Sequence, residues 1–408
     1  MQIGLICPYS LTLPGGVQGQ VLGLARMLRA SGHPTRVLGP CDGPPPDAGV
    51  TPLGDSLPTA ANGSMAPIAP DVPCALRTIR ALRDEEFDVL HLHEPLAPGP
   101  TTTALFLAAS PMVGTFHAAG GSLAYDLLNR PVRWLSRRLD RSFAVSDDAA
   151  AMASHSLGGR YEVLFNGVEV QRSRQVAPWP TEGPTVFFIG RHEPRKGLTV
   201  LLDAMSHLPP DVRLWVAGDG PETGDLRART AGDARISWLG RISDEERTER
   251  IRGADVFCAP SLRGESFGVV LLEGMACETP VVASDIPGYS RVAQGGNDAL
   301  LVPPGDARAL GTAIDKVLRN PDLADRLVAS GRARAEQFSM RRLADRYLEA
   351  YAEVVGERTA ARIGCPVATH NGCAGADSGS TGRGRSMLVS QTTALPAVHR
   401  PQTFRGPP

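Results

Sequence analysis

The stretch VFFIGRHEPRKG at residues 186–197 indicates the fold of this chain. Its apolar start, residues 186–189, is typical of a strand buried on both faces of a parallel sheet. The loop that follows carries Arg191, Arg195 and Lys196, at the strand end where open α/β sheets bind ligands. Charge-assisted bonds from such cations to a diphosphate contribute about 1.5–3 kcal/mol each. The stretch predicts a Rossmann-like domain with an anion site, and a solvated basic turn is the alternative.

A second stretch, RGESFGVVLLE at residues 263–273, places two carboxylates around a Ser-Phe-Gly turn that opens an apolar helix. Eight residues separate Glu265 from Glu273, a little over two helical turns, so we expect both acids along one side of the helix. The free N–H groups of its first turn, residues 267–270, suit a phosphate. One acid then suits a hexose and the other a ribose. An ordinary helix with an acid favoured by its dipole is the alternative.

Short apolar runs alternate with helical stretches, which favours doubly wound parallel sheets. In the first half, the predicted strands are residues 3–7, 36–38, 89–93, 112–116 and 142–145, and residues 17–30 form a helix. In the second half, they are residues 186–189, 212–217, 236–239, 256–259, 280–283 and 300–302. The sequence thus predicts two α/β domains, residues 1–168 and 184–340, joined by a proline-containing linker at 169–183.

Residues 357–408 have a different composition, rich in Gly, Ser, Thr, Pro and Arg and poor in acids. Such a segment buries too little apolar surface to offset its ordering entropy, so we predict a disordered tail. A contribution of its arginines to binding an anionic membrane is the alternative.

Bulk properties restrict the class of protein further. The chain has 408 residues, enough for two cores, and a formal net charge of −1, which argues against a nucleic-acid partner. Its seven cysteines show no paired metal spacing, as in a reducing compartment. No basic leader or membrane-spanning apolar run is present in the sequence. We therefore expect a cytoplasmic location, either free or on a membrane surface.

Several motifs resemble the retaining glycosyltransferases of family four, which have the GT-B fold. Arg191, Lys196, Glu265 and Glu273 match the donor-site signature of that family. Further stretches resemble the actinobacterial phosphatidylinositol mannosyltransferases, namely ICPYS (6–10), PGGVQ (14–18), NGS (62–64), FDVLHLHEP (87–95), TFH (115–117), EPRKG (193–197) and ASD (283–285). The resemblance covers roughly residues 1–355. It implies two Rossmann-like domains that face across a cleft, with a crossover helix at 341–356 that returns to the first domain.

The resemblance also implies an activity and roles for single residues. The activity is transfer of mannose from GDP-mannose, a nucleotide-sugar, to a phosphatidylinositol-type lipid acceptor. The implied catalytic residues are His117, Arg191, Lys196 and Glu265. The implied donor-binding residues are Gly16, Arg191, Lys196, Ile242, Asp244, Glu265, Phe267, Gly268, Val269 and Glu273. The implied acceptor-binding residues are Tyr9, Gln18, Asn62, Ser64, His117 and Arg195.

His117 follows a predicted strand, and the resemblance implies that it lies between the acceptor and the donor sugar. A neutral imidazole there would accept a hydrogen bond from a sugar hydroxyl. For the other eight histidines we expect hydrogen bonds to backbone instead.

The chain contains no Asp-x-Asp pair to hold a metal under a diphosphate. Fixed cations and a helix N-terminus supply the charge instead, so we predict no obligatory cofactor and no metal site. This leaves room for stimulation by a divalent cation. The resemblance further implies that the leaving phosphate helps to deprotonate the acceptor.

The stretch LRTIRALR at residues 76–83 carries a basic edge beside an apolar stripe. The edge consists of Arg77, Arg80 and Arg83. Such a helix is typical of surfaces that lie on an anionic membrane, here the inner face of the plasma membrane. The alternative is a helix that packs Leu76, Ile79 and Leu82 on its sheet and solvates its arginines.

The acceptor half departs from the mannosyltransferase pattern directly after His117. Residues 118–122 read AAGGS, where the relatives have hydroxyl residues followed by a lysine. A cation that would meet a lipid phosphate is therefore missing, which leaves Arg195 for that contact. Another lipid, a small polyol or a UDP-sugar donor stays open. A GT-B isomerase or a non-catalytic sugar-nucleotide binder is the interpretation from a different class.

Overall fold

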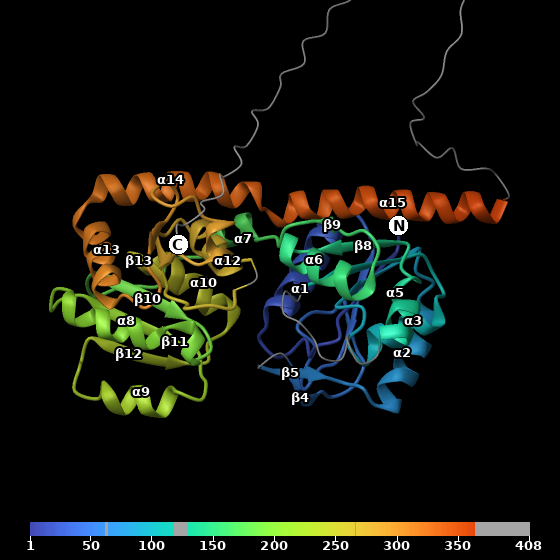
Figure 1. Ribbon diagram of the computed structural model, residues 1–408, viewed down its shortest axis with the longest axis horizontal. Helices are drawn as coiled ribbons and strands as arrows, with labels where there is room; N and C mark the ends of the chain where they lie inside the picture. Colours follow the sequence, from blue (N-terminus) through green and yellow to red (C-terminus); the bar gives the residue numbers. More distant parts are fainter. Residues whose placement is uncertain (62–63, 118–128, 266, 364–408) are drawn as a thin grey trace, which may run out of the picture. The chain divides into compact units, whose positions relative to one another are not determined.

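The computed structural model describes residues 1–61, 64–117, 129–265 and 267–363. Within these ranges the chain forms two α/β domains, each built on a parallel sheet with helices on both faces (Figure 1). The predicted pair of Rossmann-like domains is therefore confirmed.

The first sheet has the strand order β3-β2-β1-β6-β7-β8-β9, and all its neighbouring strands are parallel. Its strands are β1 (Ile3–Ile6), β2 (Thr35–Gly39), β3 (Val50–Pro52), β6 (Val89–His93), β7 (Met112–Phe116), β8 (Arg141–Ala144) and β9 (Glu162–Val163). Its helices are α1 (Gly16–Ala30), α2 (Val72–Asp84), α3 (Pro100–Leu107), α5 (Asn129–Ser136) and α6 (Asp147–Leu157). An antiparallel pair that the sequence did not reveal, β4 (Leu57–Ala61) and β5 (Ser64–Ile68), precedes α2. The strand order reverses between β1 and β6, and ligands of doubly wound sheets bind at such a point.

The second sheet has the order β12-β11-β10-β13-β14-β15 and is also parallel. Its strands are β10 (Thr185–Ile189), β11 (Arg213–Ala217), β12 (Ile236–Gly240), β13 (Val256–Ala259), β14 (Val281–Ser284) and β15 (Leu300–Val302). Its helices are α8 (Leu198–Ala204), α9 (Thr223–Arg229), α10 (Asp244–Gly253), α11 (Val269–Ala276), α12 (Pro287–Ser290), α13 (Ala307–Arg319) and α14 (Pro321–Gln337), with the 3₁₀ turns η1 (Pro194–Lys196) and η2 (Met205–His207). Here the strand order reverses between β10 and β13.

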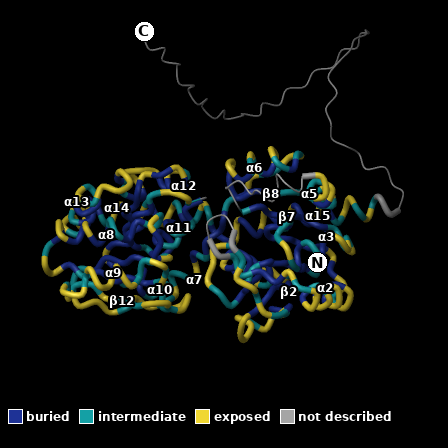
Figure 2. The backbone as a smooth tube through the Cα atoms, turned by 60° about the horizontal axis from the view of Figure 1, so that its bottom comes forward, coloured by how far each residue is buried: buried dark blue, intermediate teal, exposed yellow. Residues whose placement is uncertain are grey.

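Buried residues follow the strands and the inner faces of the helices in both domains (Figure 2). In the second domain, α10, α11 and the end of α14 cover one face of the sheet, and α8, α13 and the start of α14 pack in the core on the other. In the first domain, α2 and α3 cover one face. The opposite face is covered by α1 together with the last helix, α15 (Met340–Ile363), which inserts Tyr347 and Tyr351 into the same core as Ile3 and Leu5.

Two predicted boundaries are wrong. The last helix continues to Ile363, so the tail does not begin at residue 357. Residues 357–362 read ERTAAR and are mostly good helix formers, and Arg358 pairs with Asp140 of the first domain at 2.8 Å. Residues 364–408, the rest of the predicted tail, lie outside the described residues. The predicted linker contains a helix, α7 (Val170–Gln175), because Val170 is buried in the second core.

Candidate active site

The loops that leave β10 and β13 meet where the strand order of the second sheet reverses. Gly197 has a φ of 67°, and a Cβ at this position would lie 2.0 Å from the carbonyl oxygen of Pro260. Only glycine therefore allows the two loops to approach so closely. This contact brings Lys196, which follows β10, to Glu265, which follows β13: the Lys196 Nζ lies 2.6 Å from the Glu265 Oε1.

Further hydrogen bonds fix the carboxylate of Glu265. The Ser261 hydroxyl donates to its Oε1 at 3.0 Å and in turn receives a bond of 2.9 Å from the Tyr289 hydroxyl. Burial, and secondly the nearby Glu265 carboxylate, raise the pKa of Tyr289, so its hydroxyl remains a donor. Glu265 is thus held in one orientation by Lys196 and Ser261, and through Ser261 by Tyr289 of α12.

The other cations of this loop also have carboxylate partners. Glu193 pairs with both arginines, at 2.9 Å from its Oε1 to the Arg191 Nε and at 2.9 Å from its Oε2 to the Arg195 Nε. Arg195 also lies 3.8 Å from Glu265. Three cations therefore face two carboxylates, which leaves a net positive charge for an anionic ligand.

The expectation that Glu265 and Glu273 lie along one side of a helix is wrong. Helix α11 begins only at Val269, since Gly264 and Gly268 have φ angles of 78° and 88°, outside the helical range. Glu265 therefore lies in the loop before the helix, and the first helical turn starts two residues later than predicted. The ring of Phe267 packs against Phe338 in the core, so its side chain is not available to a donor.

Glu273 lies on α11 beside the start of α10. Arg247 of α10 lies between two acids, 3.5 Å from Glu273 and 3.5 Å from Asp244. The Glu273 carboxylate raises the pKa of Arg247 above its usual value. The structure thus gathers Glu273 and Asp244 of the predicted donor site, with Ile242 packed on the core nearby. Arg247 was not predicted, because nothing in a single sequence shows which charge of α10 faces α11.

A second polar cluster lies where β6 and β7 of the first sheet end, and it consists of histidines. The rings of His91 and His93 are stacked with centroids 4.2 Å apart, and the His93 Nδ1 lies 3.0 Å from the His117 Nε2. Residues two apart on a strand share a face, which explains why His91 and His93 stack. The register pairs His93 with Thr115 of the neighbouring strand β7. His117 is the first residue after that strand and therefore lies just beyond His93.

Side chains of α15 continue this cluster. The His91 Nδ1 lies 2.6 Å from the Tyr351 hydroxyl, and its Nε2 lies 2.7 Å from the Thr115 hydroxyl. The Thr115 hydroxyl lies 3.0 Å from that of Tyr347. The expectation that histidines other than His117 bond to backbone is therefore wrong for His91 and His93. The crossing of α15 over the sheet supplies these hydroxyl partners.

All three imidazoles of the cluster are neutral at pH 7. Burial lowers the pKa of His91 to about 3 and that of His117 to about 4. Burial and the two neighbouring rings lower the pKa of His93 well below its usual value. Charging any ring would place a cation in a buried environment, which is unfavourable.

The backbone of His117 is fixed as well as its ring. Its N–H donates to the Glu94 Oε1 at 2.8 Å, and Glu94 itself has a φ of 47°, in the left-handed region. A buried non-glycine residue in this conformation persists only when its surroundings enforce it. Glu94 thus carries backbone strain at the position where it holds His117.

Comparison with known proteins agrees with this geometry. Residues 14–172 match the family described as Glycosyltransferase Family 4, and residues 169–334 match Glycosyl transferases group 1. The chain is 40% identical over 367 residues to the phosphatidyl-myo-inositol mannosyltransferase of Mycobacterium leprae, covering 87% of this chain and 97% of that protein. The chain belongs to glycosyltransferase family four.

Other relatives support the same assignment. The phosphatidyl-myo-inositol mannosyltransferase of Mycobacterium tuberculosis is 38% identical over 373 residues, which cover 87% of this chain and 98% of the relative. Among solved structures, sucrose-phosphate synthase from Thermosynechococcus elongatus has a TM-score of 0.68 at 20% identity, covering 88% of this chain and all of that one. Anabaena HepE in complex with UDP has a TM-score of 0.65 at 20% identity, with 86% and 100% covered. These two structures support the GT-B fold, and the family shows that this chain is a glycosyltransferase.

Most residues predicted to bind the acceptor belong to the first domain of this glycosyltransferase, whereas Arg195 belongs to the second. Tyr9 forms a bridge to Ile68. Gln18 is buried, and its amide donates to the Ser10 carbonyl at 3.3 Å, which stabilises the loop before α1. Gly16, which was predicted to bind the donor, is the exposed first residue of α1. Asn62 and the side chain of Ser64 lie outside the described residues.

Helix α2 of the glycosyltransferase does not bury its whole apolar stripe. The inward positions are Cys74, Thr78, Ala81 and Leu82. Leu76 and Ile79 are instead 61% and 38% exposed, so the alternative interpretation, in which they pack on the sheet, is wrong for these two residues. The Arg80 and Arg83 side chains are 80% and 75% exposed beside Asp84, whereas Arg77 donates to the Leu53 carbonyl at 3.2 Å.

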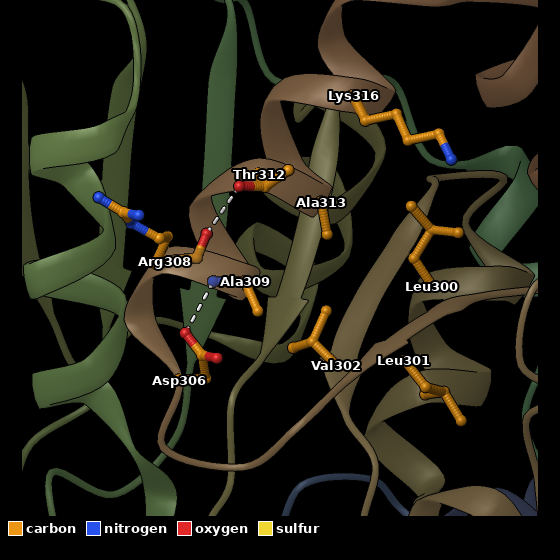
Figure 3. A pocket seen from close by; sticks show the side chains of 9 residues that line it. All are labelled: Leu300, Leu301, Val302, Asp306, Arg308, Ala309, Thr312, Ala313 and Lys316. Atoms are coloured by element: carbon orange, nitrogen blue, oxygen red, sulfur yellow. Dashed lines mark hydrogen bonds between the residues drawn. The ribbon is translucent and has the colours of Figure 1, made fainter.

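Among the described residues, no group of three His, Cys, Asp or Glu side chains is arranged to hold a metal ion, and no helix is long and apolar enough to cross a membrane. Figure 3 shows a hollow of about 480 Å³ between α13 and the edge strand β15. It is lined by Leu300, Leu301, Val302, Asp306, Arg308, Ala309, Thr312, Ala313 and Lys316. None of these residues belongs to the predicted site.

Proposed function

We propose that this glycosyltransferase transfers mannose, with retention, from GDP-mannose to a phosphatidylinositol-type lipid at the inner face of the plasma membrane. The observation that carries the proposal is the pairing of Lys196 with Glu265 beside Arg191 and Arg195, at the reversal point of the second sheet. Cations suit the diphosphate of a nucleotide-sugar, and a fixed carboxylate suits sugar hydroxyls. The mannose and the lipid come from what the mannosyltransferase relatives are named for.

In this proposal the charged loop stabilises the leaving group. Negative charge grows on the diphosphate as the bond to the sugar breaks, and Lys196 and Arg191 offset that charge. The leaving phosphate takes the proton of the acceptor hydroxyl on the same face of the sugar. Glu273 binds a ribose hydroxyl, and His117 orients the sugar as a neutral imidazole.

A surface of the first domain suits an anionic membrane. On α2, the exposed apolar residues Val72, Leu76 and Ile79 lie on the same helix as the exposed Arg80 and Arg83. The neighbouring helices α3 and α5 expose the aromatic residues Phe106 and Trp134, whose ring centroids lie 6.2 Å apart. Exposed apolar groups flanked by arginines are typical of proteins that lie in the interfacial region of a bilayer.

A second candidate function differs only in the substrates. Residues 118–122, AAGGS, lack the lysine that the mannosyltransferase pattern places after His117. This difference favours an acceptor without an inositol phosphate, such as another lipid or a small polyol. A UDP-sugar donor stays compatible with the charged loop, because the cations there contact a diphosphate and not a base.

The decisive experiment is a product screen with mass detection. The full chain is incubated with GDP-mannose, GDP-glucose or UDP-glucose, each with phosphatidylinositol vesicles, phosphatidylglycerol vesicles or free inositol. We expect a mannosylated lipid only with GDP-mannose and phosphatidylinositol. Product on another lipid or on free inositol would establish the second candidate, and donor binding without any transfer would contradict both.

The membrane surface needs a separate test. Each exposed arginine near an anionic surface contributes about 1 kcal/mol, so replacing both Arg80 and Arg83 with Gln should weaken binding to phosphatidylglycerol vesicles about 30-fold at low salt. Arg319→Gln is the control, since Arg319 is also exposed but pairs with Asp315 on α13 of the other domain. Equal losses in the control and the double variant would remove α2 from the membrane surface.

A further inference from the structure

His93 is buried and has one unsatisfied ring nitrogen. Its Nδ1 lies 3.0 Å from the His117 Nε2, whereas its Nε2 has no hydrogen-bond partner in the described part of the chain. His93 is 2% exposed, so water does not reach it freely. The arrangement of protons in this pair is therefore restricted to two possibilities.

In the first arrangement, the His93 Nδ1 carries the proton and donates to the His117 Nε2. The unpaired atom of His93 is then a bare lone pair. In the second arrangement, the His117 Nε2 donates to the His93 Nδ1, and His93 must carry its own proton on the unpaired Nε2. Neutral imidazole has one N–H and one acceptor nitrogen, so no third arrangement satisfies the short contact.

The two arrangements differ in what they leave buried without a partner. An orphaned N–H is rarer in protein interiors than an under-satisfied acceptor, as backbone groups show. The first arrangement places the unpaired N–H on the half-buried His117 and not on the fully buried Nε2 of His93, and it is favoured for this reason. Burial also keeps both rings neutral, because it lowers the pKa of His117 to about 4 and that of His93 well below its usual value.

We infer that His93 is a positioning residue which fixes His117 in the tautomer that carries its proton on Nδ1. His117 then presents an N–H donor to its ligand, since its Nε2 is occupied and its Nδ1 has no partner among the residues that the structure describes. It binds an oxygen lone pair of a sugar hydroxyl or a phosphate and does not accept a proton. This differs from the sequence-based expectation, in which the imidazole accepts a bond from a hydroxyl.

The consequence of this tautomer for sugar transfer rests on the proposed function. The tautomer of His117 itself does not depend on that function. If His117 only donates, proton removal from the acceptor falls to another group, which agrees with the leaving phosphate as the base. His117 contributes by holding one oxygen in place, and His93 contributes only through His117.

The test measures the tautomer directly on the full chain labelled with ¹⁵N in its imidazole rings. Two-bond ¹H–¹⁵N correlation spectra show which ring nitrogen carries the proton, and the His117→Gln variant assigns the signals of residue 117. We expect a protonated Nδ1 and a bare Nε2 for His117. A proton on its Nε2 overturns the inference, whatever substrate the enzyme uses.

Variants of His93 test the positioning role. His93→Asn keeps an N–H donor for His117, whereas His93→Leu removes it and fills the space with an apolar group. We expect kcat to fall about tenfold in His93→Leu, with the KM for the donor unchanged within about twofold, and to recover largely in His93→Asn. A packing role alone would give the opposite order, with Leu better tolerated than Asn.

His91→Asn is the matched control, because His91 is equally buried and stacks on His93 but bonds to Thr115 and Tyr351. We expect it to lower stability while the tautomer of His117 stays the same. A changed tautomer in this control, or an unchanged one in His93→Leu, would show that His93 does not set it.

Discussion

The two strand-end clusters of this glycosyltransferase are built from opposite kinds of polar group. After β10 and β13, the side chains are full charges, each paired with an opposite charge within 4 Å. After β6 and β7, they are neutral imidazoles and hydroxyls connected by hydrogen bonds of 2.6–3.0 Å. Charges suit a ligand that is itself charged, such as a diphosphate, whereas neutral donors suit oxygen atoms that must be oriented. On the proposed function, the two domains therefore divide electrostatic stabilisation from positioning.

The largest expected effect is on the charged cluster. Lys196→Ala and Arg191→Ala should each reduce kcat/KM by an amount equivalent to about 2–4 kcal/mol of transition-state stabilisation. Both cations offset charge that grows in the transition state. Circular dichroism should show that folding is intact. Arg319→Ala is a matched control, as Arg319 pairs with Asp315 on the surface of α13, away from the site. Near-normal kinetics in either site variant would remove that residue from the charged cluster.

The next effect separates the two acids of the second domain. Glu265→Gln should lower kcat, since it loses the charge that Lys196 and Ser261 orient toward the reacting sugar. Glu273→Gln should mainly weaken nucleotide binding, by about 1 kcal/mol, because a ribose hydroxyl binds alike in the ground and transition states. Calorimetric titration with GDP checks the second variant. Unchanged affinity there would mean that Glu273 serves only to pair with Arg247.

The neutral histidine cluster should make the free energy of unfolding fall as the pH drops. A salt bridge that needs a charged histidine would instead make it rise. The pKa of His91 is about 3 in the folded chain and about 6.5 when unfolded. Between these values the unfolded chain binds more protons, so the free energy of unfolding falls as the pH drops below about 6.5. At pH 5.5 His91 alone should contribute a loss of about 1.4 kcal/mol. Urea titrations at pH 7.5 and 5.5 measure this loss, and equal stabilities would contradict a neutral, buried cluster.

The smallest effect tests the link from this cluster to α15. Tyr347→Phe removes the hydroxyl that lies 3.0 Å from Thr115 but keeps the ring in the core. It should lower the free energy of unfolding by about 1 kcal/mol without changing donor affinity. A loss of several kcal/mol would show that the hydroxyls act as one network in which the bonds depend on one another.

The sequence predicted the buried strands well, but it predicted the contacts between neighbouring elements poorly. The runs at β6, β7 and β13 matched their predicted bounds because each strand is buried along its whole length and most of its residues are apolar or small. The edge strands β3 and β9 were missed, since three and two residues carry no period. Glu265 and Lys196 were named from motifs, yet the helix start was misplaced because the φ angles of Gly264 and Gly268 are set by tertiary contacts. The role of His93 depends on the register of β6 against β7, which a linear pattern does not contain.

The burial of α15 in the first core has a consequence for how the chain is made. Residues 340–354 complete a core that begins with Ile3, so more than three hundred residues must leave the ribosome before that core closes. Until then, the nascent first domain exposes the apolar face on which Tyr347 and Tyr351 later pack. Chaperones and proteases act on such faces, and prematurely terminated chains would remain their substrates. Completion of synthesis is therefore itself a checkpoint for folding of the first domain.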